Sequence, residues 1–230
     1  MKKTGRNSRD ISVPAGAFKI SEYMPPARRQ TFIVMLAGIG IMGGGVALFK
    51  LSLMGNDPHT ALMIAIGNRL GVDFSLVLFL VNCLWFFAEW CSDRDLIGIG
   101  TFVNWFFVGP LASLCEKAVR SVWGVPSEID TRIWLMMAGV VTLSLACALY
   151  QTADMGVAPY DALSMILSRK SRLSYLRCRM LTDSLCALAA FLLGGLIGVG
   201  TLVCAVGLGP FITFFSKKVA RRLIPASEKT

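Results

Sequence analysis

The chain has 230 residues, of which 55% are hydrophobic and only 16% are charged, and its mean hydropathy is +0.63. A soluble protein of this length needs far more polar surface, so the composition excludes an ordinary soluble domain and favours a lipid bilayer. The net charge of +9 does not indicate nucleic acid, because most lysines and arginines flank apolar segments. This pattern predicts a multi-pass protein of the bacterial plasma membrane with both termini in the cytoplasm.

Six apolar segments are each close to the ~20 residues that a helix needs to cross a bilayer. They cover residues 31–53, 74–91, 96–115, 133–152, 180–195 and 199–215. The first lies too far downstream and is too long for an ordinary cleaved signal, so we expect it to be retained. Basic tails over residues 1–30 and 217–230 enclose these segments.

Two shorter elements interrupt the series, and each follows a Gly-x-x-Pro turn. Gly55 to Pro58 precedes a short helix over 58–70, and Gly156 to Pro159 precedes one over 159–168. Proline is tolerated in the first turn of a helix, while glycine lets the preceding chain reverse. Short helices at matching places in two repeats are typical of transporter binding sites, although packing elements or interfacial helices are the plainer alternative.

An offset of 101 residues aligns the first half of the chain with the second. Met54-Gly55 then matches Met155-Gly156, and Pro58 matches Pro159. With an offset of 100, "LIGIGT" at 96–101 matches "LIGVGT" at 196–201. We therefore predict an all-α membrane protein with two homologous repeats, each containing three long helices and one short one. The repeats cover 31–115 and 132–216, with a connecting loop over 116–131.

The number of crossings depends on whether the short elements span the membrane. Eight crossings would make the repeats parallel and leave few basic residues outside. Six crossings would make the repeats inverted and place Lys50, Arg69, Lys117, Arg120 and Arg132 outside. The charge distribution favours eight crossings and the length of the short elements favours six. We favour eight slightly.

The strongest candidate for a functional side chain is Asp183, because an ionisable residue inside a span is costly unless it is paired or faces a cavity. Arg179 precedes it by four residues and would neutralise it on one helix face. Asn82 occupies the matching position of the first repeat. The two residues either bind a ligand between the repeats or simply join neighbouring helices.

The first turns of the short helices hold further candidates, Pro58, His59, Pro159, Tyr160 and Asp161. Helix capping explains Asp57 and Asp161 without any function. His59 is either a proton-sensitive group or an ordinary interfacial histidine. As the single histidine of the chain, it cannot build a multi-histidine metal site or a credible nucleophilic enzyme site. The seven cysteines show no metal-ligand spacing. We therefore expect that the protein holds no cofactor and no metal and has no enzymatic activity.

Glycine-rich turns recur at the starts of two spans. Their Gly-x-Gly-Thr pattern lacks the strand and the Lys of a phosphate loop, so helix packing explains the glycines better. Thr101 and Thr201 could still contact a solute at the mouth of a cavity. The Gly40/Gly44 pair has the GxxxG spacing of close helix contacts. The residues expected to be structural in turns are Gly55, Gly98, Gly100, Gly109, Pro110, Gly156, Gly198, Gly200, Gly209 and Pro210.

The segment "MGVAPYDALSM", with the later "LIGVGTLVCAVGLGPFITFF", resembles the YczE-like branch of the YczE/YitT family of bacterial integral membrane proteins. The resemblance covers about residues 31–218. Its motif maps to Gly156, Pro159, Asp161 and Leu163, then to Gly198, Gly200, Thr201, Gly209 and Pro210. Ala158 and Tyr160 depart from the usual pattern, as does Thr60 in place of aspartate in the first repeat. The resemblance implies an uncharacterised group of permease-like proteins.

The resulting hypothesis is a secondary transporter for an unidentified small solute, bound between the repeats near Asn82, Asp183 and the two Gly-x-x-Pro turns. The alternative is a membrane partner that does not transport, such as an assembly factor, a sensor or a substrate-binding subunit. The expected partners are the lipid bilayer, the solute, and either a second copy or another membrane protein. The chain carries no nucleotide-binding motif of its own.

Overall fold

The computed structural model describes residues 26–224, and this part of the chain contains helices and no strands. The predicted all-α fold is thus confirmed. The elements are α2 (Pro26–Ser52), α3 (Pro58–Leu70), α4 (Phe74–Ser92), η1 (Arg94–Leu96), α5 (Ile99–Trp123), α6 (Ile129–Thr152), α7 (Pro159–Lys170), α8 (Tyr175–Leu192), α9 (Val199–Phe215), η2 (Ser216–Ala220) and α10 (Arg221–Leu223).

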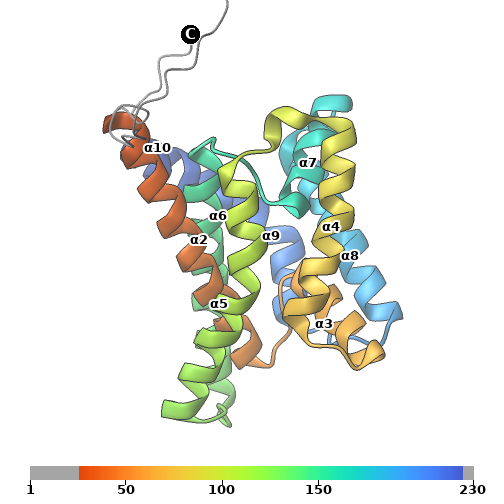
Figure 1. Cartoon of the computed structure of the whole chain (residues 1–230). Helices are drawn as coiled ribbons and strands as arrows, with labels where there is room; N and C mark the ends of the chain where they lie inside the picture. The colour runs from red at the N-terminus through yellow and green to blue at the C-terminus, as the bar shows by residue number, and fades with distance from the viewer. Residues whose placement is uncertain (1–25, 225–230) are drawn as a thin grey trace, which may run out of the picture.

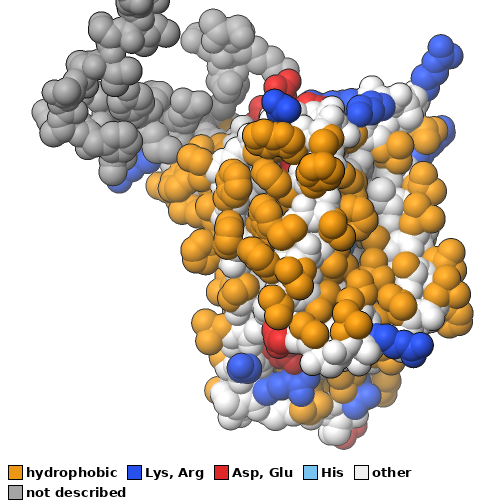
Figure 2. All heavy atoms as spheres, turned by 45° about the vertical axis from the view of Figure 1, so that its right-hand side comes forward, with side chains coloured by type: hydrophobic (Ala, Val, Ile, Leu, Met, Phe, Trp, Pro, Cys, Tyr) orange, Lys and Arg blue, Asp and Glu red, His pale blue; other side chains and the backbone are white. Residues whose placement is uncertain are grey.

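Within the described residues, four helices are long and apolar enough to cross a membrane: Arg29–Ser52, Phe74–Ser92, Ile129–Thr152 and Val199–Leu223. Helices α5 and α8 run beside them (Figure 1). On the face shown in Figure 2, hydrophobic side chains cover the middle of the molecule, and charged side chains gather toward its two ends. This distribution is typical of a protein that spans a bilayer.

The centre of the fold is an antiparallel contact between α2 and α6 (Figure 1). Gly38 lies against the backbone near Tyr150, Gly45 lies against Leu143, and Gly139 lies against the ring of Phe49. The residue numbers on α6 therefore decrease along the contact as those on α2 increase, which means that the two helices are antiparallel. The predicted Gly40 and Gly44 pair does not make this contact, because neither glycine has a neighbour within 4 Å of a side-chain position.

The antiparallel contact shows that the two halves run in opposite directions. Lys50 at the end of α2 pairs with Glu116 of α5, so these two helices end at the same side. Gln30 near the start of α2 donates to the carbonyl of Leu223, so the two ends of the described chain lie together. We call this end the terminal face and the opposite end the distal face. The slight preference for eight crossings and parallel halves is wrong, because it requires α2 and α6 to be parallel.

Helices α3 and α7 lie toward opposite ends of the molecule and begin in its interior (Figure 1). Each packs against both α4 and α8. The ring of His59 on α3 stacks on the ring of Tyr160 on α7, with centroids 4.1 Å apart. The two helix starts therefore meet at the centre of the molecule. Gly55 and Gly156 have φ of +102° and +108°, and this left-handed region explains why both turns require glycine.

The Gly-x-Gly-Thr turns pack against these interior turns in a reciprocal way. The Gly100 amide donates to the Met155 carbonyl at 2.7 Å, and the Gly200 amide donates to the Met54 carbonyl at 2.9 Å. A side chain at Gly98 or Gly198 would collide with the same two carbonyls. Close packing, and not phosphate binding, accounts for these glycines.

Other predicted boundaries differ from the structure. Gly109-Pro110 and Gly209-Pro210 lie inside α5 and α9 and do not form turns. Gly109 instead gives room for Leu78 of α4, and Gly209 gives room for Leu176 of α8. The expected loop over 116–131 is shorter, because α5 continues to Trp123 and α6 begins at Ile129. Apolarity marks where a helix enters lipid, whereas its backbone hydrogen bonds continue into the polar region.

Candidate functional site

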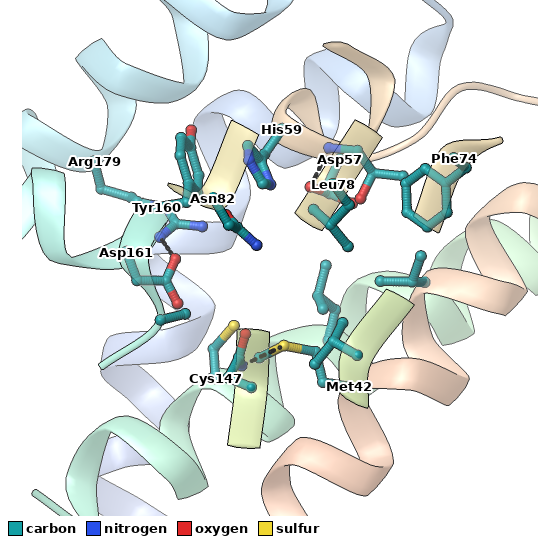
Figure 3. Close-up of a pocket in the computed structure, with 16 residues that line it drawn as sticks. Met42, Asp57, His59, Phe74, Leu78, Asn82, Cys147, Tyr160, Asp161 and Arg179 are labelled. Carbon is teal, nitrogen blue, oxygen red and sulfur yellow. Dashed lines mark hydrogen bonds and ion pairs between the residues drawn. The ribbon is translucent and has the colours of Figure 1, made fainter. Parts of the chain in front are cut away.

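An internal cavity of about 70 Å³ lies where the starts of α3 and α7 meet (Figure 3). Helices α2, α4, α5, α6 and α8 complete its wall. The lining residues are Met42, Val46, Asp57, His59, Thr60, Phe74, Leu78, Asn82, Asn104, Val108, Leu143, Cys147, Ala158, Tyr160, Asp161 and Arg179. The space holds a few water molecules or one very small solute, and is far smaller than the ~300–1,000 Å³ of drug-sized pockets.

A buried charge cluster forms one wall of this cavity. The guanidinium of Arg179 pairs with Asp161 through Nη1, and its Nε lies 3.1 Å from Oδ2 of Asp183. The amide of Gln151 donates to the second oxygen of Asp161 at 3.0 Å. Asp161 also lies in the first turn of α7, where the helix dipole favours a negative charge. The predicted pairing of Arg179 with Asp183 is confirmed.

The aromatic pair at the centre is fixed by the same cluster. The Tyr160 hydroxyl donates to Oδ1 of Asp183 at 2.5 Å, and the Arg179 guanidinium lies 5.1 Å from the Tyr160 ring centroid. The ring of His59 is stacked on the ring of Tyr160 with an interplanar angle of 13°. His59 is only 9% exposed, so it is an interior residue and the interfacial alternative is wrong.

Three lining side chains carry a buried polar atom that has no protein partner. These atoms are Oδ2 of Asp57, Nε2 of His59 and Oδ1 of Asn82. The residues are 8%, 9% and 5% exposed, so bulk water does not hydrate them freely. Unpaired buried polar atoms are unfavourable, and the cavity places all three around the same space. A ligand that donates hydrogen bonds to carboxylate and amide oxygens would satisfy them.

Apart from two threonines, the predicted site residues fall into three groups. Asn82, His59, Tyr160 and Asp161 line the cavity. Asp183 does not line it but stands behind Tyr160 and Arg179 and holds both. Pro58 and Pro159 open α3 and α7 at the first position without lining the cavity.

The two candidate threonines do not lie at a cavity mouth. The hydroxyl of Thr101 accepts the Gly98 amide and donates to the Leu96 carbonyl, which stabilises its own turn. Thr201 is 0% exposed beside Gly55. Both belong to the reciprocal turn contact, so their expected place in the site is corrected.

Several lining residues were not identified from the sequence as site candidates. Asp57 was explained only as a cap, and the structure confirms that its Oδ1 accepts the Thr60 amide. Its second oxygen nevertheless has no hydrogen-bond partner, and the residue lines the cavity. Arg179 was assigned only as the neutralising partner of Asp183. Asn104 gave a signal that could have been used, since it is a polar residue within an apolar segment.

A second, open hollow of about 550 Å³ lies at the distal face, where α2 and α5 end. The Lys50–Glu116 ion pair, 2.5 Å long, forms part of its wall. The Lys50 ammonium also lies 4.6 Å from the centroid of the Phe74 ring, and Phe74 lines the central cavity. Phe74 and this ion pair therefore separate the distal hollow from the cavity.

The chain is similar to bacterial proteins of unestablished function. A family model described as a family of unknown function, DUF6198, matches residues 29–217. An uncharacterized protein of Haemophilus influenzae is 27% identical over 85% of this chain and 87% of its own length. The Bacillus subtilis uncharacterized membrane protein YczE is 24% identical over 81% of this chain and 84% of its own length. The uncharacterized protein YyaS of the same species is 23% identical over 84% of this chain and 95% of its own length.

No solved structure matches this chain. The YczE-like resemblance proposed from the sequence is confirmed by the family match and by the similarity to YczE itself. The helical structure and its apolar spans agree with the word "membrane" in the name of that relative. The chain is therefore a helical membrane protein that belongs to the family of unknown function DUF6198.

Proposed function

We propose that this protein is a secondary transporter that binds one small polar solute in the central cavity and exposes it alternately to the two faces. The observation that carries this proposal is the cavity itself, which is lined by Asp57, His59 and Asn82, each with a buried polar atom that has no protein partner. Discontinuous helices whose N-termini meet at mid-depth are a recurring form of transporter site.

The wall of the cavity supports the interpretation of the two halves as homologous repeats. Many lining residues occur in pairs related by the offset of 101 residues: Met42 and Leu143, Val46 and Cys147, Asp57 and Ala158, His59 and Tyr160, Thr60 and Asp161, Leu78 and Arg179. The cavity thus lies on the approximate symmetry axis of the two halves. Because the halves run in opposite directions, equivalent elements face opposite sides of the membrane, as alternating access requires.

Two equivalent sets of contacts close the cavity toward the two faces. Toward the distal face stand Lys50, Phe74 and Glu116. Toward the terminal face stand their counterparts by offset, Gln151, Tyr175 and Ser216. The Tyr175 hydroxyl donates to Gln151 at 3.3 Å, and Ser216 bonds to Thr152 at 2.6 Å. We propose that opening one set at a time admits and releases the solute.

The chemistry of the cavity favours a solute with hydrogen-bond donors and a positive charge. Asp161 and Asp183 pair with the single guanidinium of Arg179, and Asp57 lines the same cavity, so the site has more carboxyl groups than cations. The start of α3 is already neutralised by its own Asp57 cap, which leaves little attraction for an anion. A small primary amine or guanidinium compound fits the free oxygens of Asp57 and Asn82.

The orientation follows from the positive-inside pattern. The terminal face carries Arg169, Lys170, Arg172, Arg177, Lys217, Lys218, Arg221 and Arg222. The distal face mixes basic and acidic residues, such as Lys117 with Glu116 and Arg132 with Asp130. We propose that the terminal face is cytoplasmic in a bacterial plasma membrane.

The test is ligand-dependent stabilisation of the purified protein in lipid nanodiscs. A panel of small amines, guanidinium compounds, amino acids, carboxylates and sugars is screened for an increase in Tm, and each active solute is then tested for uptake into proteoliposomes. We expect an amine or guanidinium compound to stabilise the protein. The Asn82→Leu variant should bind it about tenfold more weakly, equivalent to ~1.4 kcal/mol.

The matched control is Leu80→Ala on the same helix, because Leu80 is 53% exposed on the outer surface. It should bind the solute as the unaltered chain does. Stabilisation without uptake would contradict transport. A protein that no solute stabilises, and that purifies with a stable membrane partner, would instead support the non-transporting alternative.

A further inference from the structure

One face of helix α4 carries a row of residues that leads from the cavity toward the terminal face, and most of them are polar. Leu78 and Asn82 line the cavity, and Trp85 and Glu89 follow at spacings of three and four residues. Residues spaced in this way share one face of a helix. Glu89 lies seven residues beyond Asn82, which corresponds to ~10 Å along the helix axis.

Each polar residue of this row has at least one buried polar atom without a protein partner. These atoms are Oδ1 of Asn82, Nε1 of Trp85 and both carboxyl oxygens of Glu89. Glu89 is 0% exposed, so its carboxyl group is fully enclosed by the protein. Glu89 differs in this respect from Asp161 and Asp183, because the carboxylates of those two residues pair with Arg179.

No cation of the described residues forms an ion pair with Glu89. Arg169 of α7 pairs with Asp93 at 2.5 Å, and Arg94 of η1 stacks on the Trp90 ring at 4.7 Å. Helix α5 packs beside α4 without an ionisable residue between Ile99 and Leu114. The other titratable groups on elements packed against α4 are Asp95 of η1, Tyr160, Asp161 and Lys170 of α7, His59 and Arg69 of α3, and Cys115, Glu116, Lys117 and Arg120 of α5.

A negative charge at this place would have no compensation. An ionised carboxylate buried without a partner costs several kcal/mol, whereas the protonated acid avoids most of that cost. Burial without a partner therefore favours the protonated form of the Glu89 carboxyl group. The ion pair of Asp93 and Arg169 lies beyond it toward the terminal face, with the Arg169 side chain 53% exposed.

We propose that Glu89 is a proton-binding site whose protonation is coupled to solute binding in the central cavity. The proton enters from water at the terminal face when the Asp93–Arg169 pair separates, and returns to water there when the carboxyl group becomes hydrated. Trp85 and Asn82 connect this site to the cavity along one helix face. The coupling rests on the proposed transport function, whereas the proton site itself does not.

The first measurement is the infrared spectrum of the protein in lipid at neutral pH, recorded without solute. A protonated carboxyl group gives a C=O stretching band that a carboxylate lacks. The difference between the unaltered chain and Glu89→Gln should contain one such band. Glu89→Asp should keep the band at a shifted frequency, and the control Glu116→Gln should leave it unchanged because Glu116 is paired with Lys50.

A band that persists undiminished in Glu89→Gln overturns the proton site. The second measurement repeats the spectra with a solute that raises the Tm of the unaltered chain. Solute binding should change the intensity of the Glu89 band, and an unchanged band would overturn the coupling. If no solute binds, the proposed transport function and the coupling both fail, while the first spectrum still decides whether Glu89 holds a proton.

Discussion

At the scale of single residues, the two halves of the site differ in charge. The second half contributes Asp161, Arg179 and Asp183, which form one buried network. The equivalent positions of the first half hold Thr60, Leu78 and Asn82. The same backbone geometry therefore accepts a neutral set on one side and a charged set on the other. The charged groups of the cavity therefore come mainly from the second half of the chain, although the two halves have similar backbones.

Replacing the arginine alone should strongly destabilise the protein. Arg179→Leu leaves the carboxylates of Asp161 and Asp183 buried without a cation. Breaking a buried pair in this way costs ~3–5 kcal/mol. The expected result is a large decrease in Tm in nanodiscs.

The matched variant transfers the complete first-half set, Asp161→Thr, Arg179→Leu and Asp183→Asn. It removes the carboxylates together with the guanidinium, so much of the lost stability should return. Solute binding should not return with it. A triple variant as unstable as Arg179→Leu would show that the charges are not the source of the loss.

At the scale of elements, the reciprocal turn contacts hold the interior starts of α3 and α7. The backbone of Gly198 approaches Met54 so closely that an added Cβ would lie 1.9 Å from the Met54 carbonyl oxygen. Its φ of −112° is accessible to any residue, so lack of space and not backbone strain requires glycine.

Gly198→Ala should therefore lower stability by at least ~1–3 kcal/mol through overpacking. Gly44→Ala on α2 is the control, because no neighbour lies within 4 Å of the new side chain. Alanine there should raise stability by ~0.5–1 kcal/mol, as expected inside a helix. Thermal unfolding of both variants tests the pair. Equal effects of the two substitutions would contradict the role of the turn contact.

The ion pair between Lys50 and Glu116 should control access to the cavity from the distal face. Glu116→Gln weakens the contact that holds Lys50 over the Phe74 ring. Cys147 lines the cavity and is buried, so its reaction with a membrane-impermeant maleimide reports opening. Mass spectrometry should show faster labelling of Cys147 in the variant when the reagent is added at the distal face. An unchanged rate would remove these residues from the access route.

At the scale of the whole molecule, the opposite directions of the two halves fix the topology. The turn at Gly124 follows α5, which ends on the side of Lys50, whereas Gln30 and Leu223 lie at the other face. A reporter fused at Gly124 should therefore be found on the side of the membrane opposite a reporter at the C-terminus. Intact-cell labelling compares the two positions. Both reporters on one side would contradict six crossings.

The sequence was sufficient to predict the helical class, the membrane setting and several site residues. These depend on local properties, namely long apolar segments, the left-handed turns at Gly55 and Gly156, and polar residues in apolar surroundings. Asn82 and Tyr160 were identified in this way. Gly109-Pro110 was misplaced because these residues usually signal a turn, whereas here both lie inside α5.

The sequence by itself determined what each segment is, because apolar length and turn chemistry act on neighbouring residues. Only the tertiary structure decided that α2 and α6 are antiparallel and that α3 and α7 begin at the centre. It also decided that Asp183 stands behind the cavity and that Glu89 is enclosed without a partner. The physical reason is that direction and burial depend on contacts between residues far apart in the chain, which no local pattern records.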